Sequence, residues 1–284
     1  MKIREVAIQA LCALAGLVII GCPPPPRRPA EQASQPSPPL PASFPTTRPA
    51  DTELGSYRLL VRLRLCAIEL PLGSASESEE IWRYTDDEVI QAARSANLAR
   101  NGLRVGLGQA DQWNDLAAVF KRLSGRDVSY ISTVTLPGRP VAIPAKKRQP
   151  GQVVFVLLPD GTVSGADYPP GDALLAVDCA VSEEDPATVH MTVVPQMRSS
   201  AIETTIVNRP EGAGFEASQE IYSFPSLQFQ ATVPEKDFLI IGPTASAGLP
   251  GSVGEKFLMV ERDGIRYETV FVLIPEVLTA PVRQ

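Results

Sequence analysis

The chain contains one histidine, His190, so any mechanism that needs an imidazole must use it. A Ser-His-Asp or Cys-His site would add a nucleophile beside that ring. His190 instead alternates with Val189 and Met191 in an apolar segment, and the chain has neither a G-x-S-x-G elbow nor an H-E-x-x-H zinc motif. This pattern predicts a histidine on a strand, not a catalytic base.

Three acidic clusters supply paired carboxylates of the kind that glycoside hydrolysis requires. They are Glu77–Glu80, Asp86–Glu88 and Glu183–Asp185. The first is typical of a solvated loop, the second of a helix N-terminus and the third of a hairpin tip. We therefore expect no catalytic residue, no metal site and no cofactor, while hydrolysis of envelope glycans stays open as an alternative function.

Gly102, Gly106 and Gly108 invite comparison with a nucleotide-binding loop. The third glycine of that motif is missing, and no lysine follows in the phosphate-loop position. A tight connection between a strand and a helix accounts for these glycines better.

Three aromatic residues, Trp82, Tyr84 and Trp113, suit either a platform for a sugar or peptide or the packing of helices onto a sheet. We favour packing, because aromatic side chains dominate burial in small modules. The platform remains the alternative.

A hydrophobic segment near the start of the chain ends at a cysteine. Lys2 and Arg4 precede an apolar run from Val6 to Ile20, which is shorter than the roughly 20 residues of a membrane-spanning helix. The sequence Ile19-Ile20-Gly21-Cys22 resembles the lipobox of bacterial lipoproteins. The resemblance implies signal cleavage between Gly21 and Cys22, a diacylglyceryl group on the Cys22 thiol, and a fatty acid such as palmitate on its new amino group.

The segment after Cys22 is a predicted tether. Residues 23–50 contain 11 prolines, which prevent both a helix and a sheet ladder. Such a spacer would hold the folded part away from the bilayer. Pro23 stands where an Asp would resemble an inner-membrane retention signal, so we expect an extracytoplasmic lipoprotein of the outer membrane in preference to the inner membrane.

The chain is acidic, with 26 Lys and Arg against 32 Asp and Glu. An acidic chain without a basic stripe is a poor nucleic-acid binder, so we expect no such partner. The densest basic run, Lys146-Lys147-Arg148, lies between Pro144 and Pro150 and predicts a solvated loop.

Two cysteines, Cys66 and Cys179, remain once Cys12 leaves with the signal segment and Cys22 carries lipid. An extracytoplasmic compartment permits a disulfide between them. Both lie in apolar, strand-like segments, so two buried free thiols are the alternative.

The folded part begins with a predicted α+β module over residues 53–138, after a lipidated tether over residues 22–52. In its first strand Val61, Leu63, Leu65 and Ala67 alternate with Arg62, Arg64 and Cys66. A capping box of Thr85 and Glu88 predicts a helix that ends at Asn101-Gly102. A second helix carries Leu116, Val119, Phe120 and Leu123 on one face and ends at Ser124-Gly125. The expected ranges are strand 57–70, helix 86–100, strand 103–107, helix 112–123 and strand 128–136.

Helical periodicity then disappears, and residues 139–278 read as a β-rich domain followed by a tail over residues 279–284. Asp160-Gly161 and Asp263-Gly264 are strong hairpin signals. The fold class is therefore α+β: a small two-helix module followed by a mainly antiparallel β-domain, either a sandwich or a partial barrel. The expected strands are 153–158, 174–181, 189–194, 202–207, 220–224, 227–233, 238–241, 257–261 and 267–274.

Three segments of the second half resemble the β-domain of secretins, the ring-forming outer-membrane pores of secretion and pilus systems. They are Met191–Pro195, Phe229–Gly242 and Glu268–Pro275. The sequence departs from the family where Pro243 follows Gly242 in place of a second glycine. It also has the short loop Ala245–Gly254 where secretins carry a longer amphipathic hairpin.

These features together predict a lipid-anchored cell-envelope protein with a non-catalytic binding or assembly role. Its expected partners are the membrane, through the lipid, and envelope proteins or the cell wall. A secretin-related subunit or accessory of an outer-membrane complex is an alternative and predicts oligomers, whereas a binding module predicts a monomer. The oligomeric state is left open by the sequence.

Overall fold

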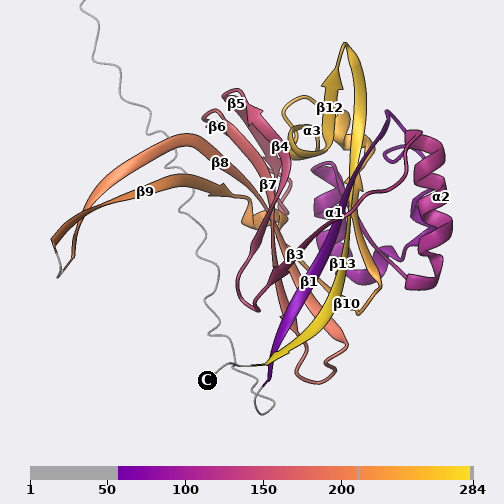
Figure 1. Ribbon diagram of the computed structural model, residues 1–284. Helices are drawn as coiled ribbons and strands as arrows, with labels where there is room; N and C mark the ends of the chain where they lie inside the picture. Colours follow the sequence, from indigo (N-terminus) through magenta and orange to yellow (C-terminus); the bar gives the residue numbers. More distant parts are fainter. Residues whose placement is uncertain (1–56, 210–211, 282–284) are drawn as a thin grey trace, which may run out of the picture. The chain divides into compact units, whose positions relative to one another are not determined.

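Two large antiparallel sheets, a separate two-stranded hairpin and three α-helices make up the described part of the chain (Figure 1). The computed structural model describes residues 57–209 and 212–281, all within the unit Pro38–Gln284. The predicted signal segment, its Gly21–Cys22 cleavage site and the proline-rich tether lie outside the described residues.

The elements follow one another in this order. The strands are β1 (Tyr57–Pro71), β2 (Leu103–Gly108), β3 (Ile131–Thr135), β4 (Val141–Gln149), β5 (Gln152–Leu157), β6 (Val163–Tyr168), β7 (Gly171–Val181), β8 (Thr188–Arg209), β9 (Gly212–Ser223), β10 (Phe229–Pro234), β11 (Phe238–Pro243), β12 (Met259–Arg262) and β13 (Ile265–Pro281). The α-helices are α1 (Ala92–Arg100), α2 (Trp113–Ser124) and α3 (Val253–Leu258). Short 3-10 helices span Trp82–Tyr84, Asp87–Val89, Ala110–Gln112, Pro225–Leu227 and Ala245–Gly248.

Sheet A joins the two ends of the folded chain. Its order is β2-β11-β13-β1-β3, and β12 pairs with β13. Strands β1 and β13 pair antiparallel from Tyr57↔Pro281 to Pro71↔Tyr267. Sheet A thus takes strands from both predicted segments, 53–138 and 139–278, and β13 extends to Pro281.

Both faces of sheet A are covered. On one face Cys66 and Ile68 of β1 belong to a buried apolar cluster with Leu116 and Phe120 of α2. On the other face Val61 belongs to the cluster shared with sheet B. The predicted single alternation of β1 is therefore wrong in its second half, because the buried face changes along the strand: Cys66 is buried and Ala67 is exposed.

Sheet B packs across sheet A to form a sandwich. Its order is β10-β8-β7-β4, with β9 pairing β8, and β5 and β6 form a separate hairpin. Val177 and Met191 of sheet B share one cluster with Leu239 and Phe271 of sheet A. The predicted α+β class with mainly antiparallel sheets is confirmed.

The predicted helix ends are confirmed more fully than the predicted starts. Gly102 and Gly125 follow the two helices at φ of 87° and 69°, in the left-handed region that favours glycine. The capping box is wrong: Thr85 Oγ1 donates to the Trp82 carbonyl, while the Asp86 side chain accepts from the Glu88 amide. Helix α1 accordingly begins only at Ala92.

The predicted face of the second helix is confirmed. Leu116, Val119 and Phe120 are buried, and Leu123 packs against the same cluster. The helix begins at Trp113, and its N-cap residue, Gln112, makes no side-chain capping bond. Asp111 lies in the 3-10 turn before it.

The second half holds both confirmed and corrected predictions. Asp160-Gly161 joins β5 to β6, and Asp263-Gly264 joins β12 to β13. The solvated loop predicted for Lys146-Lys147-Arg148 is wrong, because these residues belong to β4 and pair with β7 through two register shifts. Residues 253–258, assigned in part to a strand, form helix α3.

Among the described helices, none is both long and apolar enough to cross a membrane.

Candidate functional site: the arm of strands β8 and β9

The residues first considered for catalysis have structural partners. His190 lies exposed on β8, and its Nδ1 is 3.2 Å from Thr232 Oγ1 on the neighbouring strand. This placement agrees with the predicted strand histidine. Within residues 57–209 and 212–281, no group of three or more His, Cys, Asp or Glu side chains is placed to hold a metal ion.

The acidic clusters are engaged in ion pairs and turns. Arg104 bridges Glu79 and Asp87 at 2.7 Å each, and its hydrogen bond lowers the pKa of the Glu79 carboxyl. Arg122 pairs with Glu80. Asp185 accepts from the Thr188 hydroxyl at the β7–β8 turn, which confirms the predicted hairpin tip. These pairs tie loops to helices and strands instead of converging in a cleft.

The three aromatic residues pack the helical layer onto sheet A. Trp82 is buried and donates from Nε1 to the Ala75 carbonyl at 2.7 Å. The Trp113 ring meets the Phe238 ring edge to face at 5.2 Å between centroids. Tyr84 is half-buried against the same cluster. The preferred packing interpretation therefore matches the structure.

Two of the three glycines considered for a nucleotide loop lie on a strand, and Gly102 lies in the turn between α1 and β2. Gly106 and Gly108 both belong to β2, so the predicted strand-to-helix connection is wrong for them. A Cβ on Gly108 would come within 2.0 Å of the Phe238 ring. Gly108 leaves room for the Phe238 ring of the neighbouring strand β11, and Gly106 leaves room for Thr85 and Asp87.

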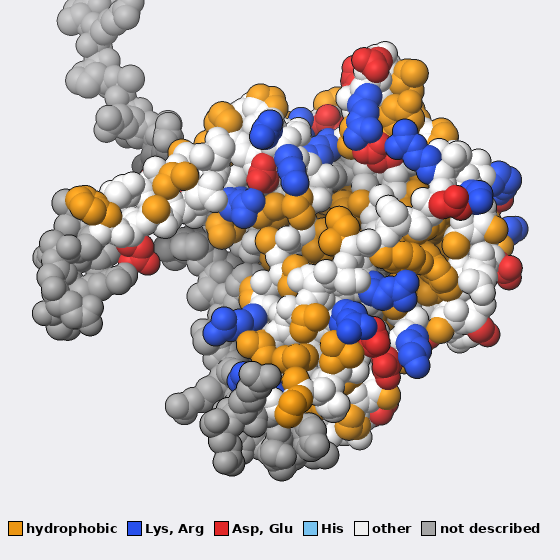
Figure 2. Space-filling model, viewed as in Figure 1, with side chains coloured by type: hydrophobic (Ala, Val, Ile, Leu, Met, Phe, Trp, Pro, Cys, Tyr) orange, Lys and Arg blue, Asp and Glu red, His pale blue; other side chains and the backbone are white. Residues whose placement is uncertain are grey.

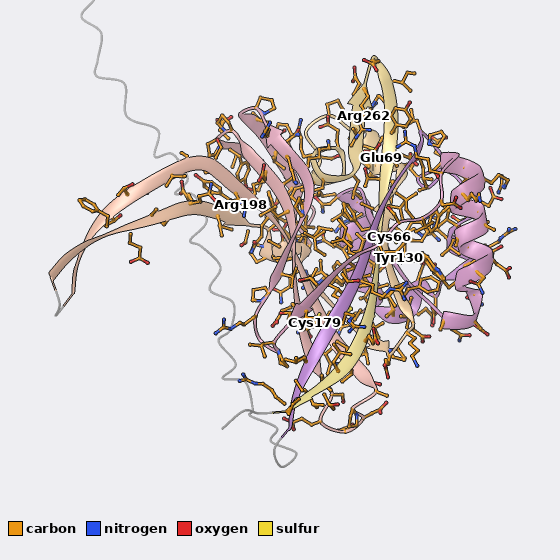
Figure 3. All side chains as sticks on the ribbon, in the orientation of Figure 1. Cys66, Glu69, Tyr130, Cys179, Arg198 and Arg262 are labelled. Carbon is orange, nitrogen blue, oxygen red and sulfur yellow. The ribbon has the colours of Figure 1, made fainter. Side chains whose placement is uncertain are left out.

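Cys66 and Cys179 are free, buried thiols in two different apolar clusters (Figure 3). Burial raises the pKa of each thiol to about 12. Of the two sequence alternatives, the structure has the unbridged one, because the two residues face opposite sides of sheet A.

Two buried polar side chains were missed by sequence reasoning. Glu268 on β13 is fully buried and accepts from the amides of Gly73, Ala75 and Ser76 at 2.8, 2.7 and 3.2 Å. It also accepts from the Ser76 hydroxyl. The signal was available: a lone carboxylate begins the apolar run that ends at Pro275.

Asn101 is the second missed residue. Its side-chain amide accepts from the Leu157 amide and donates to the Leu157 carbonyl, both at 2.8 Å. It thereby acts as one rung of a sheet ladder between the end of α1 and β5. The sequence indicated only a helix cap at this position.

The feature that remains after these assignments is a two-stranded arm, defined here as residues 200–221 of β8 and β9 (Figure 1). β8 is 22 residues long, and its pairing with β7 ends at Gly171↔Ser199. From Ile202 onward its strand pairing is with β9 alone in the described part of the chain. The two strands expected at 189–194 and 202–207 are thus one continuous strand.

The arm has two faces of different chemistry. Cross-strand pairs Ile202↔Gln219 and Thr204↔Ala217 share a face with Phe215 and Ile221, because side chains alternate along each strand. The opposite face carries the pairs Glu203↔Ser218 and Thr205↔Glu216. The arm is amphipathic, and the carboxylates Glu203 and Glu216 in its described part lie on one side.

The apolar face of the arm is open to solvent. Phe215 is 79% exposed, Ile202 65% and Ile221 42%. Hydrophobic side chains stand out along the arm in Figure 2. Large apolar side chains left exposed together mark a surface that another molecule covers.

The base of the arm is fixed to sheet B. Arg198 donates to Asp172 Oδ2 at 2.9 Å, and Asp172 Oδ1 accepts from the Arg148 amide at 2.9 Å (Figure 3). The Arg148 amide, with Arg198 second, lowers the pKa of the Asp172 carboxyl. Gln196 donates to the Ser223 hydroxyl at 3.0 Å in a buried contact. The arm therefore extends from a rigid base.

Comparison with known proteins identifies no family for this chain. No family model matches the chain, and no curated protein matches it. One solved structure similar to it is the InvG secretin domain β-barrel from the Salmonella SPI-1 injectisome, at 12% identity and a TM-score of 0.16. The match covers 80% of this chain and 61% of that chain. A TM-score this low carries no argument about function.

Proposed function

We propose that this chain is a lipid-anchored cell-envelope protein with a non-catalytic assembly role, exerted through the β8–β9 arm. One observation carries the proposal: a long amphipathic hairpin extends from the sandwich with exposed apolar side chains and unpaired strand edges. The engagement of the acidic clusters in ion pairs and turns supports a role without catalysis.

The open edges of the arm are the physical reason for assembly. A strand edge presents rows of free N–H and C=O groups that accept another strand. A two-stranded hairpin alone is marginally stable in water, and further strands are needed to give it a protected face. A strand added to the arm would pair its free N–H and C=O groups and would also give the hairpin a protected face.

The preferred partner is a second copy of the chain or a neighbouring envelope protein with a free strand. Two arms laid side by side keep the antiparallel alternation if the β9 edge of one copy meets the β8 edge of the next. Their apolar faces then form one surface, as do their carboxylate faces. The anchor at Cys22 and an outer-membrane location complete the proposal.

A secretin-related subunit or accessory of an outer-membrane complex is the second candidate. The sequence departs from secretins at the short loop Ala245–Gly254, where that family has a longer amphipathic hairpin. A long amphipathic hairpin is present at residues 200–221 instead. This candidate predicts a ring of many copies, whereas the general assembly role also permits a small oligomer or a heterologous partner.

The test is the native mass of the detergent-extracted full chain, measured by light scattering, with co-purifying proteins identified. The test variant replaces residues 203–218 with Asn-Gly, so that the pair Ile202↔Gln219 closes a two-residue hairpin. We expect an oligomer or a stable complex for the natural chain and a monomer for the variant. A natural chain that is monomeric and partner-free contradicts the assembly role.

Two further variants locate the effect. Phe215→Ser on the apolar face is expected to weaken association, and Ser218→Ala on the opposite face serves as the matched control.

Cys22→Ser tests the anchor separately: we expect the variant to leave the membrane fraction, and its retention there contradicts lipidation.

A further inference from the structure

The basic run of β4 lines a polar pocket that the assembly role does not use. This pocket, called here the β4–β12 pocket, has a volume of about 460 Å³ and lies between β4, α3 and the β12–β13 hairpin. Its cationic side chains are Lys146, Lys147, Arg262 and Arg266. Lys and Arg side chains also gather beside this hairpin in Figure 2.

Two of the carboxylates at the pocket are already paired. Arg262 donates to Glu69 Oε1 at 2.6 Å, and the two side chains lie together in Figure 3. The Glu255 carboxylate pairs with Lys256 at 2.9 Å and accepts from the Gly251 amide at 3.0 Å. Their negative charges are therefore balanced by Arg262 and Lys256.

Three cations form no ion pair within the described residues, although the Glu255 carboxylate interacts electrostatically with Lys146, and Lys147 with Asp172. Lys146 Nζ donates to the Glu255 backbone carbonyl at 2.7 Å, a contact that neutralises no charge. Lys147 and Arg266 form no ion pair within the described ranges, and Glu261 is the one further carboxylate at the rim. The pocket thus has a local excess of positive charge in a chain whose net charge is −6.

The pKa of Lys146 reflects its burial and this local excess of positive charge. Its ammonium group is half-buried, and desolvation lowers its pKa to about 8, helped by Lys256 and Arg266 and opposed by Glu255. Cations held close together and partly dehydrated are relieved by an anion that accepts hydrogen bonds from several of them.

We propose that the β4–β12 pocket binds a phosphate-type oxyanion, with Lys146, Lys147 and Arg266 as its ligands. A guanidinium group presents paired N–H donors that match phosphate oxygens, and lysines add point charges. The anion is either free inorganic phosphate or the phosphate of a lipid headgroup, since both present the same oxygens. The lysines come from β4 in sheet B and Arg266 from β13 in sheet A, so the anion would join the two sheets.

The binding test uses the detergent-extracted full chain and two probes at constant ionic strength: inorganic phosphate and the short-chain lipid dihexanoylphosphatidylglycerol. We expect phosphate to raise the melting temperature in a saturable way. A shift by the lipid that saturating phosphate does not increase further identifies a headgroup site, because both ligands then occupy one pocket, and a shift by phosphate alone identifies a free-anion site. If neither probe at 10 mM, about 100-fold above a 0.1 mM Kd, changes the melting temperature, the proposal is wrong.

Variants tie the binding to these side chains. Lys146→Gln and Arg266→Gln are each expected to weaken binding about 10-fold or more, as loss of one charged hydrogen bond predicts. Lys121→Gln is the control, because Lys121 pairs with Asp127 on the exposed side of α2. Unchanged binding in both pocket variants overturns the assignment.

A second measurement needs no variant. At pH 8 an amine-acylating reagent should label Lys146 faster than Lys121, and phosphate should slow labelling at Lys146 about 5-fold at 80% occupancy while leaving Lys121 unchanged. Labelling at Lys146 that phosphate does not slow contradicts the proposal even if a pocket variant fails to fold.

Discussion

Sheet A and the β8–β9 arm are built from the same kind of strand and differ in what covers them. Strand β13 has α2 on one side and sheet B on the other, and Phe271 is 1% exposed. Phe215 in the arm is 79% exposed. Burial of both faces places folding stability in sheet A, whereas the uncovered arm can change without unfolding the chain. The buried sheet and the exposed arm, to which we assign the proposed assembly role, are therefore separate regions.

The largest expected loss of stability comes from substituting a buried residue at the edge of the sheet A core. Glu268→Gln keeps the shape of the side chain but replaces an acceptor by an NH₂ group among donors from Gly73, Ala75 and Ser76. We expect a loss of about 3–5 kcal/mol in the free energy of unfolding, measured by denaturant titration. Glu261→Gln, exposed on β12, is the control and should change stability by less than about 0.5 kcal/mol. Equal effects of the two variants would contradict this role for Glu268.

The next largest loss of stability is expected at the contact between the end of α1 and β5. Asn101→Ala removes both bonds to Leu157 and leaves the half-buried amide and carbonyl of Leu157 without these partners. An expected loss of about 2–3 kcal/mol follows from unsatisfied buried polar groups. Asn114→Ala on the exposed side of α2 is the matched control. Hydrogen exchange at the Leu157 amide should rise in the first variant only, and a protected amide there would refute the account.

Glu268 and Asn101 also show which contacts could not be predicted from the sequence. Local signals located much of the secondary structure: the apolar face of α2, the Gly125 cap and the Asp263-Gly264 turn are short-range patterns with a direct physical cause. Glu268 and Asn101 act through contacts 192–195 and 56 positions away in the chain. Periodicity within one segment carries no information about such partners.

The pairing of β1 with β13 escaped prediction for the same reason. Each strand was expected, but their register joins the start and the end of the folded chain. Strand β8 was foreseen only as two separate strands, 189–194 and 202–207, because a bulge between Arg198 and Ile202 interrupts the alternation. Lys146 was assigned to a loop by its neighbouring prolines, although β4 accommodates Pro144 at a register shift.

A smaller effect is expected at the base of the arm. Asp172→Asn weakens the contacts to Arg148 and Arg198 and should cost about 0.5–1 kcal/mol at pH 7, since the pair is partly exposed. The folded-state pKa of Asp172 is lowered, so its contribution is present above the ordinary pKa of an aspartate. It is lost as pH falls through the lowered value. The natural chain and the variant should therefore converge in stability in acid.

Denaturant titrations from pH 7 to pH 2.5 measure this convergence. Asp127→Asn is the comparison, because its pair with Lys121 is more exposed, with the Asp127 side chain 82% accessible. That variant should differ little from the natural chain at any pH. A stability difference for Asp172→Asn that grows in acid would reverse the sign argued here.

The smallest expected effect, that of Phe215→Ser, is measured against the same chemical change made in the core. Phe271→Ser removes a fully buried ring from the cluster between the sheets and should cost about 3–5 kcal/mol. Phe215→Ser makes the same change on the arm and should alter the free energy of unfolding by less than about 0.5 kcal/mol. Denaturant titration of both variants under monomeric conditions measures the difference. If Phe215→Ser costs as much as Phe271→Ser, the arm is part of the folding core, and the separation of stability from recognition fails. If its cost stays small while association is lost, the exposed ring is present for a partner and not for the fold.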